Sequence, residues 1–464
     1  MSAEPTRAPA NGQLALDLPA SLPDIPLVPD WKDLPRLWGH SLHPMCSYLA
    51  SFPAALTHSF IARYTRPGDV VLDPFSGRGT TALQACAEGR IGVGNDLNPF
   101  AHLLTAAKVE PASRAASTTR LTALRLGWHS DADAWSALGE RVVRDPTSAA
   151  VPAAASREGP DGTSGGAVPA EVAIAFHPHT LGQLLYVRSM LDQSDRTDRF
   201  LAAAISGILH GKSRSYLSVL MPNTFSMAPR YVLDFARQNA FSPPRRDVFD
   251  GLSAKLDRLY RQPLPPVEGI ALLGDARDIA GRVRVELRRR GRPDRARLVV
   301  ASPPYLRVVK YGYYNWLRTW FLGFDSREID ATLDDAHHRE PYLAFLRDVL
   351  AGMRPVLADD AVVVLVIGDV ETDRGRVIHD GIGLAERVWE ESAAPEGYRL
   401  AGIALDDVAA GRKMTKLWGD EAGRATKTDR ILVLGASEAG RRRALAGATV
   451  DVDWTWPTRS LRVV

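Results

Sequence analysis

The stretch Val70-Val71-Leu72-Asp73-Pro74-Phe75-Ser76-Gly77-Arg78-Gly79-Thr80 decides the fold of this chain. Its first residues are a short β-branched run typical of a strand, and the residues from the aspartate onward form a glycine-containing turn. A helix is expected from Thr81 to Glu88, where Gly89 ends it, and Ile91 to Gly94 should be a second strand that leads to Asp96. This order of elements predicts one half of a doubly wound α/β sheet.

The same alternation of strands and helices returns in the second half of the chain. Ala361 to Ile367 is an unbroken apolar run, which is typical of a parallel strand buried on both faces. Further strands are expected at Ile270 to Leu273, Leu298 to Ala301 and Arg430 to Leu434, with helices at Tyr342 to Met353 and Gly381 to Glu391. We therefore expect an α/β protein with a Rossmann-like doubly wound sheet.

Composition divides the chain into segments. Residues 146–170 are rich in proline, alanine, glycine and serine, so a flexible linker is expected there. The apolar spacing around this linker predicts a mostly helical insertion. The expected organisation is a flexible N-terminal arm (1–35), one half of the α/β domain (36–110), the insertion (111–267), the other half (268–440) and a C-terminal tail (441–464).

Overall composition excludes several classes of protein. The 464 residues include 57 Lys and Arg against 54 Asp and Glu, and a net charge of +3 excludes a histone-like polycation. Two cysteines, Cys46 and Cys86, cannot build a disulfide framework or a cysteine-rich zinc site, and we expect no metal. Since no apolar run could span a membrane and no signal peptide is recognised, we expect a soluble, cytoplasmic protein.

The glycines of the first turn indicate a ligand site. Glycine lets the backbone approach a ligand closely, and the N-terminus of the following helix offers free N–H groups to a negative group. Asp96, at the end of the next strand, could accept hydrogen bonds from both hydroxyls of a ribose. The pattern matches the dinucleotide motif G-x-G-x-x-A, but it also fits a tight turn without a ligand, so it does not decide the function alone.

Ser302-Pro303-Pro304-Tyr305 is the second motif with chemical content. Its prolines fix the backbone in a rigid turn, although a plain strand-ending loop would look the same. An exocyclic amine of cytosine or adenine is a poor nucleophile because its lone pair is delocalised into the ring. A side-chain oxygen, a main-chain carbonyl and an aromatic ring held rigidly together would orient such an amine and stack on an extruded base.

Together the two motifs resemble those of the S-adenosylmethionine-dependent DNA amino-methyltransferases. The glycine turn resembles the first motif of that family. The Ser-Pro-Pro-Tyr turn resembles the fourth, whose serine form is typical of cytosine-N4 enzymes. The resemblance implies a methyltransferase sheet whose first half binds S-adenosylmethionine and whose second half is catalytic. It implies catalytic roles for Ser302, Pro303, Pro304 and Tyr305, and cofactor contacts by Asp73, Phe75, Ser76, Gly77, Gly79, Thr80, Asp96 and Asp275.

Other segments resemble the family less closely. His43-Pro44 and the stretch from Ser51 to Leu56 resemble its tenth motif, which closes over the methionine end of the cofactor, but an amphipathic helix leading into the sheet is the alternative. Asp275 could equally cap a helix. Arg78 stands where serine is common. The cofactor half also precedes the catalytic half here, whereas many Ser-Pro-Pro-Tyr enzymes have the reverse order.

Basic and aromatic residues outside these motifs are candidates for contacting DNA. We expect substrate contacts by Lys310 and Tyr311 after the catalytic turn, and by Lys212, Arg214 and Arg230 in the insertion, where we would look for target recognition. The run from Arg282 to Arg297 contains eight arginines, which could contact phosphates or form a solvated helix face.

The resulting hypothesis is a site-specific DNA methyltransferase that transfers a methyl group directly to N4 of a flipped cytosine in double-stranded DNA. Adenine-N6 in DNA, or a base in RNA, is the alternative. A nucleotide-dependent oxidoreductase would leave the Ser-Pro-Pro-Tyr turn unexplained, and a non-catalytic relative would not need both motifs intact. No nuclease motif is recognised, so a restriction endonuclease partner would be a separate chain.

Overall fold

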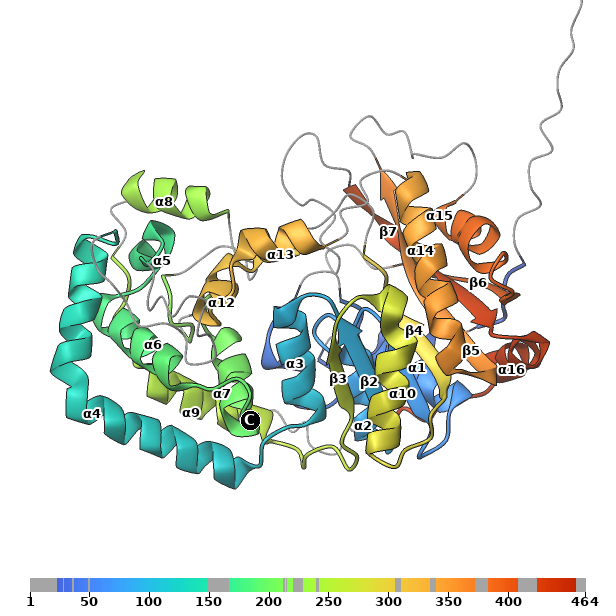
Figure 1. Cartoon of the computed structure of the whole chain (residues 1–464), viewed down its shortest axis with the longest axis horizontal. Helices are drawn as coiled ribbons and strands as arrows, with labels where there is room; N and C mark the ends of the chain where they lie inside the picture. The colour runs from blue at the N-terminus through green and yellow to red at the C-terminus, as the bar shows by residue number, and fades with distance from the viewer. Residues whose placement is uncertain are drawn as a thin grey trace, which may run out of the picture.

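The computed structural model consists of a β-sheet lobe beside a lobe of helices (Figure 1). It describes residues 23–27, 29–35, 37–48, 51–147, 167–211, 213, 215–219, 228–238, 242–304, 310–333, 339–371, 383–407 and 424–455. Within these ranges, no helix has the length and apolar character needed to cross a membrane.

The sheet has seven strands in the order β3-β2-β1-β4-β5-β7-β6. Along the chain they are β1 (Val70–Asp73), β2 (Ile91–Asp96), β3 (Ile270–Leu273), β4 (Ala296–Ala301), β5 (Leu357–Glu371), β6 (Arg399–Asp407) and β7 (Arg424–Gly435). The first five strands are parallel, and β7 is antiparallel to both β5 and β6. Because the strand order reverses between β1 and β4, ligands are expected at their carboxyl ends.

Helices connect the strands and form the second lobe. In the sheet lobe they are α1 (Ala54–Tyr64), α2 (Thr80–Ala87), α3 (Pro99–Val109), α10 (Ile279–Arg289), α14 (Arg339–Met353), α15 (Leu384–Arg387) and α16 (Glu438–Ala448). Short helical turns occur at Asp30–Asp33, His43–Met45, Ala276–Asp278, Arg354–Val356 and Val388–Ala393. In the helical lobe they are α4 (Arg114–Arg144), α5 (Ala170–Ala175), α6 (Pro178–Met190), α7 (Arg196–Ser206), α8 (Pro229–Gln238) and α9 (Val248–Leu259). After β4 come α11 (Tyr311–Tyr314), α12 (Trp316–Phe321) and α13 (Ser326–Thr332).

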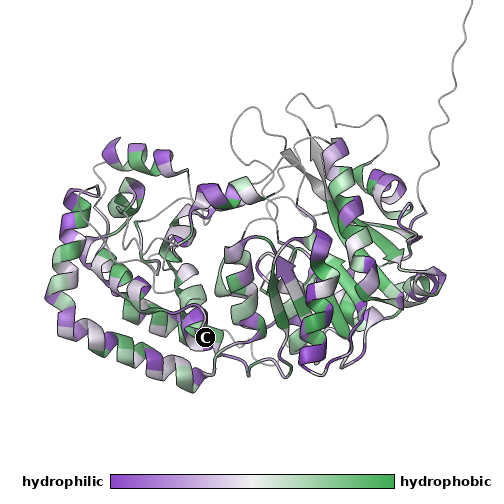
Figure 2. Cartoon of the chain, viewed as in Figure 1, coloured by the Kyte–Doolittle hydropathy of each residue, from purple (hydrophilic) through white to green (hydrophobic). Residues whose placement is uncertain are grey.

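Both faces of the sheet are buried. One face packs against α10 and α14, and the other packs against α1 and α16. Successive residues of β5 alternate between these cores, with Val363 and Leu365 in one and Val362 and Val364 in the other. A strand buried on both faces has no solvent side, which explains its unbroken apolar sequence. Figure 2 shows the same concentration of apolar residues in the strands.

The helical lobe shares a hydrophobic core with the sheet lobe. One cluster of buried residues includes Tyr48 and Phe100 from the sheet lobe, Leu184 and Phe200 from the helical lobe, and Trp316 from α12. The insertion is therefore packed directly onto the cofactor half of the domain.

The fold class predicted from the sequence is confirmed, and most elements lie within a few residues of their expected positions. β3 begins and ends where the apolar run does, at Ile270 and Leu273. β6 was not anticipated, because glycine and aspartate are depleted in strands and weaken its pattern. The antiparallel direction of β7 depends on how the chain returns to the sheet, which no local pattern records.

The expected N-terminal arm is partly packed. Its first 22 residues lie outside the described part of the chain. The Ile25 N–H donates to the Ile403 carbonyl oxygen at 3.1 Å, so this segment runs along the edge strand β6. Trp31 is only 3% exposed. Its apolar side chains are scattered among prolines, so composition alone wrongly suggested a loose arm for residues 23–35.

The expected tail and linker also have ordered parts. The tail was placed at 441–464, but residues 441–448 belong to α16, where Ala444 and Ala448 are buried. Within the expected linker, residues 148–166 lie outside the described residues, whereas Val168 is buried and Ala170 begins α5.

Candidate active site

The glycine turn joins β1 to α2 at the carboxyl edge of the sheet. Gly77 and Gly79 have φ values of 51° and 75°, in the left-handed region that favours glycine. A Cβ atom on Gly79 would also lie 2.9 Å from the hydroxyl oxygen of Thr105. The turn therefore depends on Gly79 both for its backbone conformation and for the close approach of α3.

Hydrogen bonds brace this turn against β2 and α3. The Gly77 N–H donates to Asp96 Oδ2 at 2.8 Å, and the Asn98 N–H donates to Asp96 Oδ1 at 2.9 Å. The Ser76 and Thr105 hydroxyl oxygens lie 2.9 Å apart. A carboxylate oxygen accepts more than one hydrogen bond, so Asp96 can brace the turn and still accept from a ligand hydroxyl.

Two carboxyl groups lie at this edge, Asp73, which is buried, and Asp96 at the end of β2, which is half-buried, and no cation is among the causes that shift their pKa. Burial raises the pKa of Asp73 to about 7 and that of Asp96 to about 6. The Phe75 N–H donates to Asp73 Oδ1 at 3.1 Å, which offsets only part of the effect on Asp73. A cationic ligand beside these groups would favour their ionised forms.

The catalytic turn expected from the sequence follows the strand next to β1. Because β1 and β4 are parallel neighbours, their carboxyl ends meet at one edge. The Thr81 hydroxyl, in the first turn of α2, donates to the Val300 carbonyl oxygen at 3.0 Å. This bond ties the glycine turn to β4 just before the catalytic turn.

The residues of the catalytic turn are described up to its second proline. Ser302 and Pro304 are half-buried, and Pro303 is buried. Tyr305 lies outside the described residues. The structure thus brings the Ser-Pro-Pro backbone to the same edge as the glycine turn.

The other expected cofactor residues are more varied. The Phe75 ring lies 5.9 Å from the Phe345 ring of α14, measured between centroids, and Thr80 is buried at the start of α2. Asp275 accepts the Arg277 N–H at 2.8 Å and pairs with the Arg277 guanidinium at 2.6 Å. These bonds hold the pKa of Asp275 below its usual value. They are the contacts of a helix cap, so its cofactor contact remains a prediction.

Two tyrosine rings stack beside the glycine turn. The rings of Tyr48 and Tyr311 have centroids 5.8 Å apart and planes at 18°. The Asn98 side-chain amide donates to the Tyr48 hydroxyl at 3.2 Å, and a Cβ on Gly77 would lie 3.5 Å from the Tyr48 ring. Burial, with a contribution from the Asp96 charge, raises the pKa of both phenols. Tyr311 was expected to contact substrate, but its described contact is with the segment before α1.

The remaining DNA candidates lie in separate places. Lys310 is exposed immediately before α11. Arg230 is on α8, with its side chain 92% exposed and a guanidinium nitrogen 3.9 Å from Asp234. Lys212 and Arg214 lie outside the described residues. Contact with DNA remains a prediction for all four.

Most of the arginine run lies away from this site. α10 starts near the carboxyl edge and returns toward the amino ends of the strands, where β4 begins (Figure 1). Arg288 pairs with Asp294 at 3.0 Å, and Arg289 pairs with Glu286 at 2.8 Å. These pairs are those of a solvated surface, which was the alternative considered for the run.

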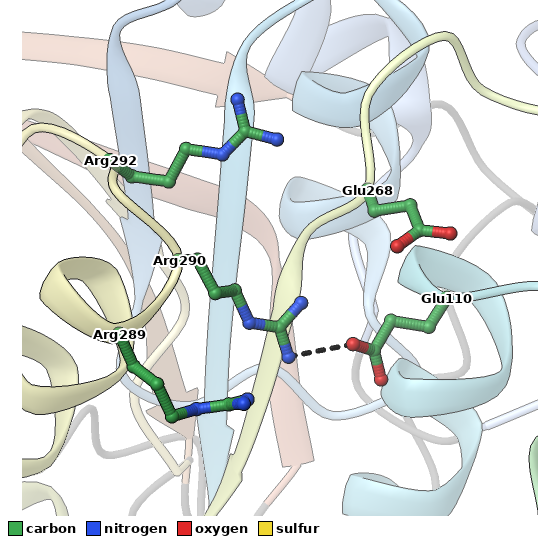
Figure 3. Close-up of a pocket in the computed structure, with 5 residues that line it drawn as sticks. All are labelled: Glu110, Glu268, Arg289, Arg290 and Arg292. Carbon is green, nitrogen blue, oxygen red and sulfur yellow. Dashed lines mark ion pairs between the residues drawn. The ribbon is translucent and has the colours of Figure 1, made fainter.

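A cavity of about 400 Å³ opens where this run meets the start of the insertion. Figure 3 shows three arginines on one side, Arg289, Arg290 and Arg292, facing Glu110 and Glu268 on the other. Arg290 pairs with Glu110 at 2.7 Å. This ion pair neutralises one of the three arginines at the amino edge of the sheet.

The sequence analysis missed the residues that support the turn from behind. Tyr48, Asn98 and Thr105 contact it, yet none belongs to a motif used in the prediction. One signal was available, because an asparagine before a proline is typical of a helix N-cap, and Asn98 caps α3. Tyr48 lies between the two stretches that resemble the tenth motif, so only its neighbours in the sequence indicated its position.

The part of the chain that contains the glycine turn is similar to known methyltransferases. Residues 29–107 match the DNA methylase family of N6- and N4-methyltransferases. The type II methyltransferase M.MjaII of Methanocaldococcus jannaschii is 35% identical over 71 residues, which are 15% of this chain and 13% of that protein. M.Cfr9I of Citrobacter freundii is 41% identical over 64 residues, 14% of this chain and 21% of that protein. The chain thus matches less than a quarter of the length of either relative.

Alignments with solved structures have low scores. TrmN from Thermus thermophilus aligns over 83% of this chain and 50% of its own, with 12% identity and a TM-score of 0.27. The rRNA methyltransferase aviRa from Streptomyces viridochromogenes aligns over 87% of this chain and 94% of its own, with 12% identity and a TM-score of 0.29.

Proposed function

We propose that this chain transfers a methyl group from S-adenosylmethionine to an exocyclic amine of DNA, with N4 of cytosine as the target. Residues 29–107 match the DNA methylase family, which supports the proposal. The observation that carries this proposal is the neighbouring position of two turns. Ser302-Pro303-Pro304 follows β4, and the glycine turn follows the adjacent parallel strand β1. A donor and an acceptor held at these turns would therefore meet at one edge of the sheet.

The glycine turn suits S-adenosylmethionine as a ligand. When bound, this molecule would supply a methyl group on a positively charged sulfur. Transfer would form a carbon–nitrogen bond and break the carbon–sulfur bond, with S-adenosylhomocysteine as the leaving group and one amine proton released to solvent. Asp73 and Asp96 offer carboxyl groups whose raised pKa values reflect burial without a compensating cation. Gly77 and Gly79 keep the backbone accessible, and Asp96 can accept from ribose hydroxyls. Ser76, Thr80 and Phe75 complete the proposed contacts.

The catalytic turn would activate the amine by position. The Ser302 hydroxyl oxygen and the Pro303 carbonyl oxygen would each accept a hydrogen bond from the amine, which localises its lone pair on nitrogen. Tyr305 would stack on the base after it leaves the duplex. The rigid prolines hold these acceptors in place before substrate arrives, so little reorganisation is needed in the transition state.

The helical lobe is the proposed site of DNA recognition. It supplies Arg230 on α8 and, outside the described residues, Lys212 and Arg214. Lys310 and Tyr311 follow the catalytic turn and would extend the contact toward the flipped base. A restriction endonuclease partner, if the chain has one, would be a separate protein.

Incorporation of a labelled methyl group tests the proposal. The full chain is incubated with methyl-tritiated S-adenosylmethionine and double-stranded DNA, and the DNA is digested to nucleosides for mass spectrometry. We expect N4-methylcytosine. Detection of N6-methyladenine would support the same mechanism with adenine as the target base. A parallel reaction contains RNA in place of DNA. Label in RNA alone would change the substrate, and no label in either nucleic acid would overturn the proposal.

A further inference from the structure

Residues 40–48 lie between the glycine turn and the helical lobe, and their polar contacts run to both. This segment includes the short helical turn His43–Met45 and ends at Tyr48, whose ring lies against Gly77. It is therefore one direct connection between the helical lobe and the glycine turn.

On the sheet side, the segment is held by α2 and α3. His43 Nε2 lies 2.8 Å from Gln84 Oε1. The ammonium group of Lys108, which is 0% exposed, donates to the Arg78 carbonyl oxygen at 2.6 Å and to the His43 carbonyl oxygen at 3.4 Å. One buried lysine thus joins the backbone of the glycine turn to the backbone of the segment.

On the other side, the end of α9 and the residues after it hold the segment. His40 Nε2 lies 2.8 Å from the Pro263 carbonyl oxygen. The Ser41 hydroxyl donates to the Leu259 carbonyl oxygen at 2.6 Å. These bonds attach the start of the segment to the helical lobe.

Two cations extend that attachment toward Tyr48. Lys255 of α9 donates to the Pro44 carbonyl oxygen at 3.0 Å. Arg318 of α12 donates to the Ser47 hydroxyl at 2.8 Å and to the Ser206 carbonyl oxygen at 3.3 Å. Arg318 follows the catalytic turn in the chain, so it joins the catalytic half, the helical lobe and the segment.

Close backbone packing adds to these bonds. A Cβ on Gly207, which follows α7, would overlap the Met45 carbonyl oxygen. Only glycine therefore lets α7 approach the segment this closely. The helical lobe is in contact with the segment from Pro44 to Ser47.

Lys255 is an unusual residue for this position. It is 7% exposed, and burial lowers the pKa of its ammonium group to about 8. Among the described residues, no carboxylate forms an ion pair with it. Burying a charge costs free energy that a hydrocarbon side chain of similar size would avoid. We attribute the presence of a buried lysine here to its hydrogen bond with the Pro44 carbonyl oxygen.

We propose that Lys255 and Arg318 are positioning residues through which the helical lobe fixes the position of Tyr48. The Tyr48 ring would form one wall of the cofactor site. They hold the segment on which Tyr48 rests against the glycine turn. Binding of DNA to the helical lobe and binding of cofactor at the turn are then linked, and the linkage is reciprocal. This inference rests on the proposed function and adds a regulation of the same site.

Titration calorimetry of the full chain with S-adenosylhomocysteine tests the inference. The titration is done well below the melting temperature of each variant. Lys255→Met should weaken binding about tenfold. Without the bond to Pro44 the segment shifts, and the Tyr48 ring no longer fits against the ligand. Lys255→Arg should restore most of the affinity, since it keeps a charged donor. Arg258→Met removes a charge from an exposed position of the same helix and should have no effect. In assays, Lys255→Met should raise KM for S-adenosylmethionine and leave kcat nearly unchanged.

A second variant keeps the test decisive if Lys255→Met does not fold. Ser47→Ala removes the hydroxyl that accepts from Arg318 without adding volume, and it should weaken binding about threefold. Saturating double-stranded DNA should tighten S-adenosylhomocysteine binding in the wild type and much less in either variant. Unchanged affinity and unchanged DNA linkage in folded variants would overturn the inference alone. A wild-type chain that binds no S-adenosylhomocysteine would instead overturn the proposed function.

Discussion

The two edges of the same sheet carry charge in opposite ways. At the carboxyl edge, Asp73 is buried and Asp96 is half-buried, and desolvation raises the pKa of both, with no cation among the causes. At the amino edge, arginines are abundant and paired at the surface, as Arg288 is with Asp294 and Arg290 is with Glu110.

This difference shows which kind of charge indicates a site. A dense run of arginines is conspicuous in a sequence, but partners neutralise much of it and water screens the rest. A desolvated carboxyl without a neighbouring cation is inconspicuous in the sequence. Its ionised form is unfavourable, and a positively charged ligand would stabilise it. Four predictions test this comparison.

The largest effect is expected at the carboxyl edge from Ser302→Ala. Loss of one oriented acceptor should lower kcat on the order of a hundredfold. Binding of S-adenosylhomocysteine should be unchanged, because its proposed contacts lie on other strands. Single-turnover methylation and calorimetry measure the two quantities. Full activity would remove Ser302 from the mechanism.

A smaller effect is expected from Asp96→Asn. The amide keeps the size of the side chain, but one of its ends becomes a donor facing the Gly77 or Asn98 N–H, so the turn loses part of its brace. Cofactor affinity should fall at least about tenfold, because a hydrogen bond to a charged group is lost. Asp275→Asn is the matched control. Its carboxyl is already paired with Arg277, and we expect a weaker effect.

The third effect depends on pH. A carboxyl whose pKa is higher in the folded than in the unfolded chain stabilises the fold at low pH, and this stability is lost as pH rises through the folded value. The ligand-free protein should therefore gain stability from Asp73 and Asp96 as pH falls from 8 toward 5. Cofactor affinity should change in the opposite direction, weakening about fivefold between pH 8 and 6.5.

Thermal melts and calorimetry across this range measure both trends. Asp73→Asn should remove the part of the pH dependence centred near pH 7, since burial raises the pKa of Asp73 to about 7. Stability and affinity that rose together on acidification would contradict the assignment of these carboxyls to the ligand site.

The smallest effect is expected at the amino edge. Replacing Arg288, Arg289 and Arg292 together by alanine should change DNA affinity by less than about twofold and leave its salt dependence unaltered. Each phosphate contact contributes close to one unit to the salt slope, so a slope that flattens by about three would assign the run to DNA. Arg230→Ala and Lys310→Ala provide the comparison, because both should reduce the slope.

The sequence predicted those parts of the site in which a short segment makes its own structure. The glycine turn is one example, because Gly77 and Gly79 adopt left-handed conformations that local residue type already favours. The Ser302 turn is another, since prolines end the strand and fix the backbone. The fold class followed from the alternation of such segments, and β3 matches its apolar run.

The structure corrected predictions in which a residue's role depends on distant partners. Ile25, Leu27 and Trp31 are buried, and the edge strand β6 offers this segment a backbone partner. Composition suggested a loose arm there, but the packing partner decided the contact. Asp275 pairs with Arg277 two residues later, and its contact with a cofactor remains a prediction.

The sequence by itself determined the parallel strands, the two turns and the resemblance to a methylase, because these depend on backbone preference and local periodicity. Only the tertiary structure decided that β1 and β4 are neighbours, that Tyr48 lies against Gly77, and that Lys255 reaches the Pro44 carbonyl oxygen. Those contacts join residues far apart in the chain. They arise from packing two lobes around one core, a constraint that acts on the whole molecule and on no single segment.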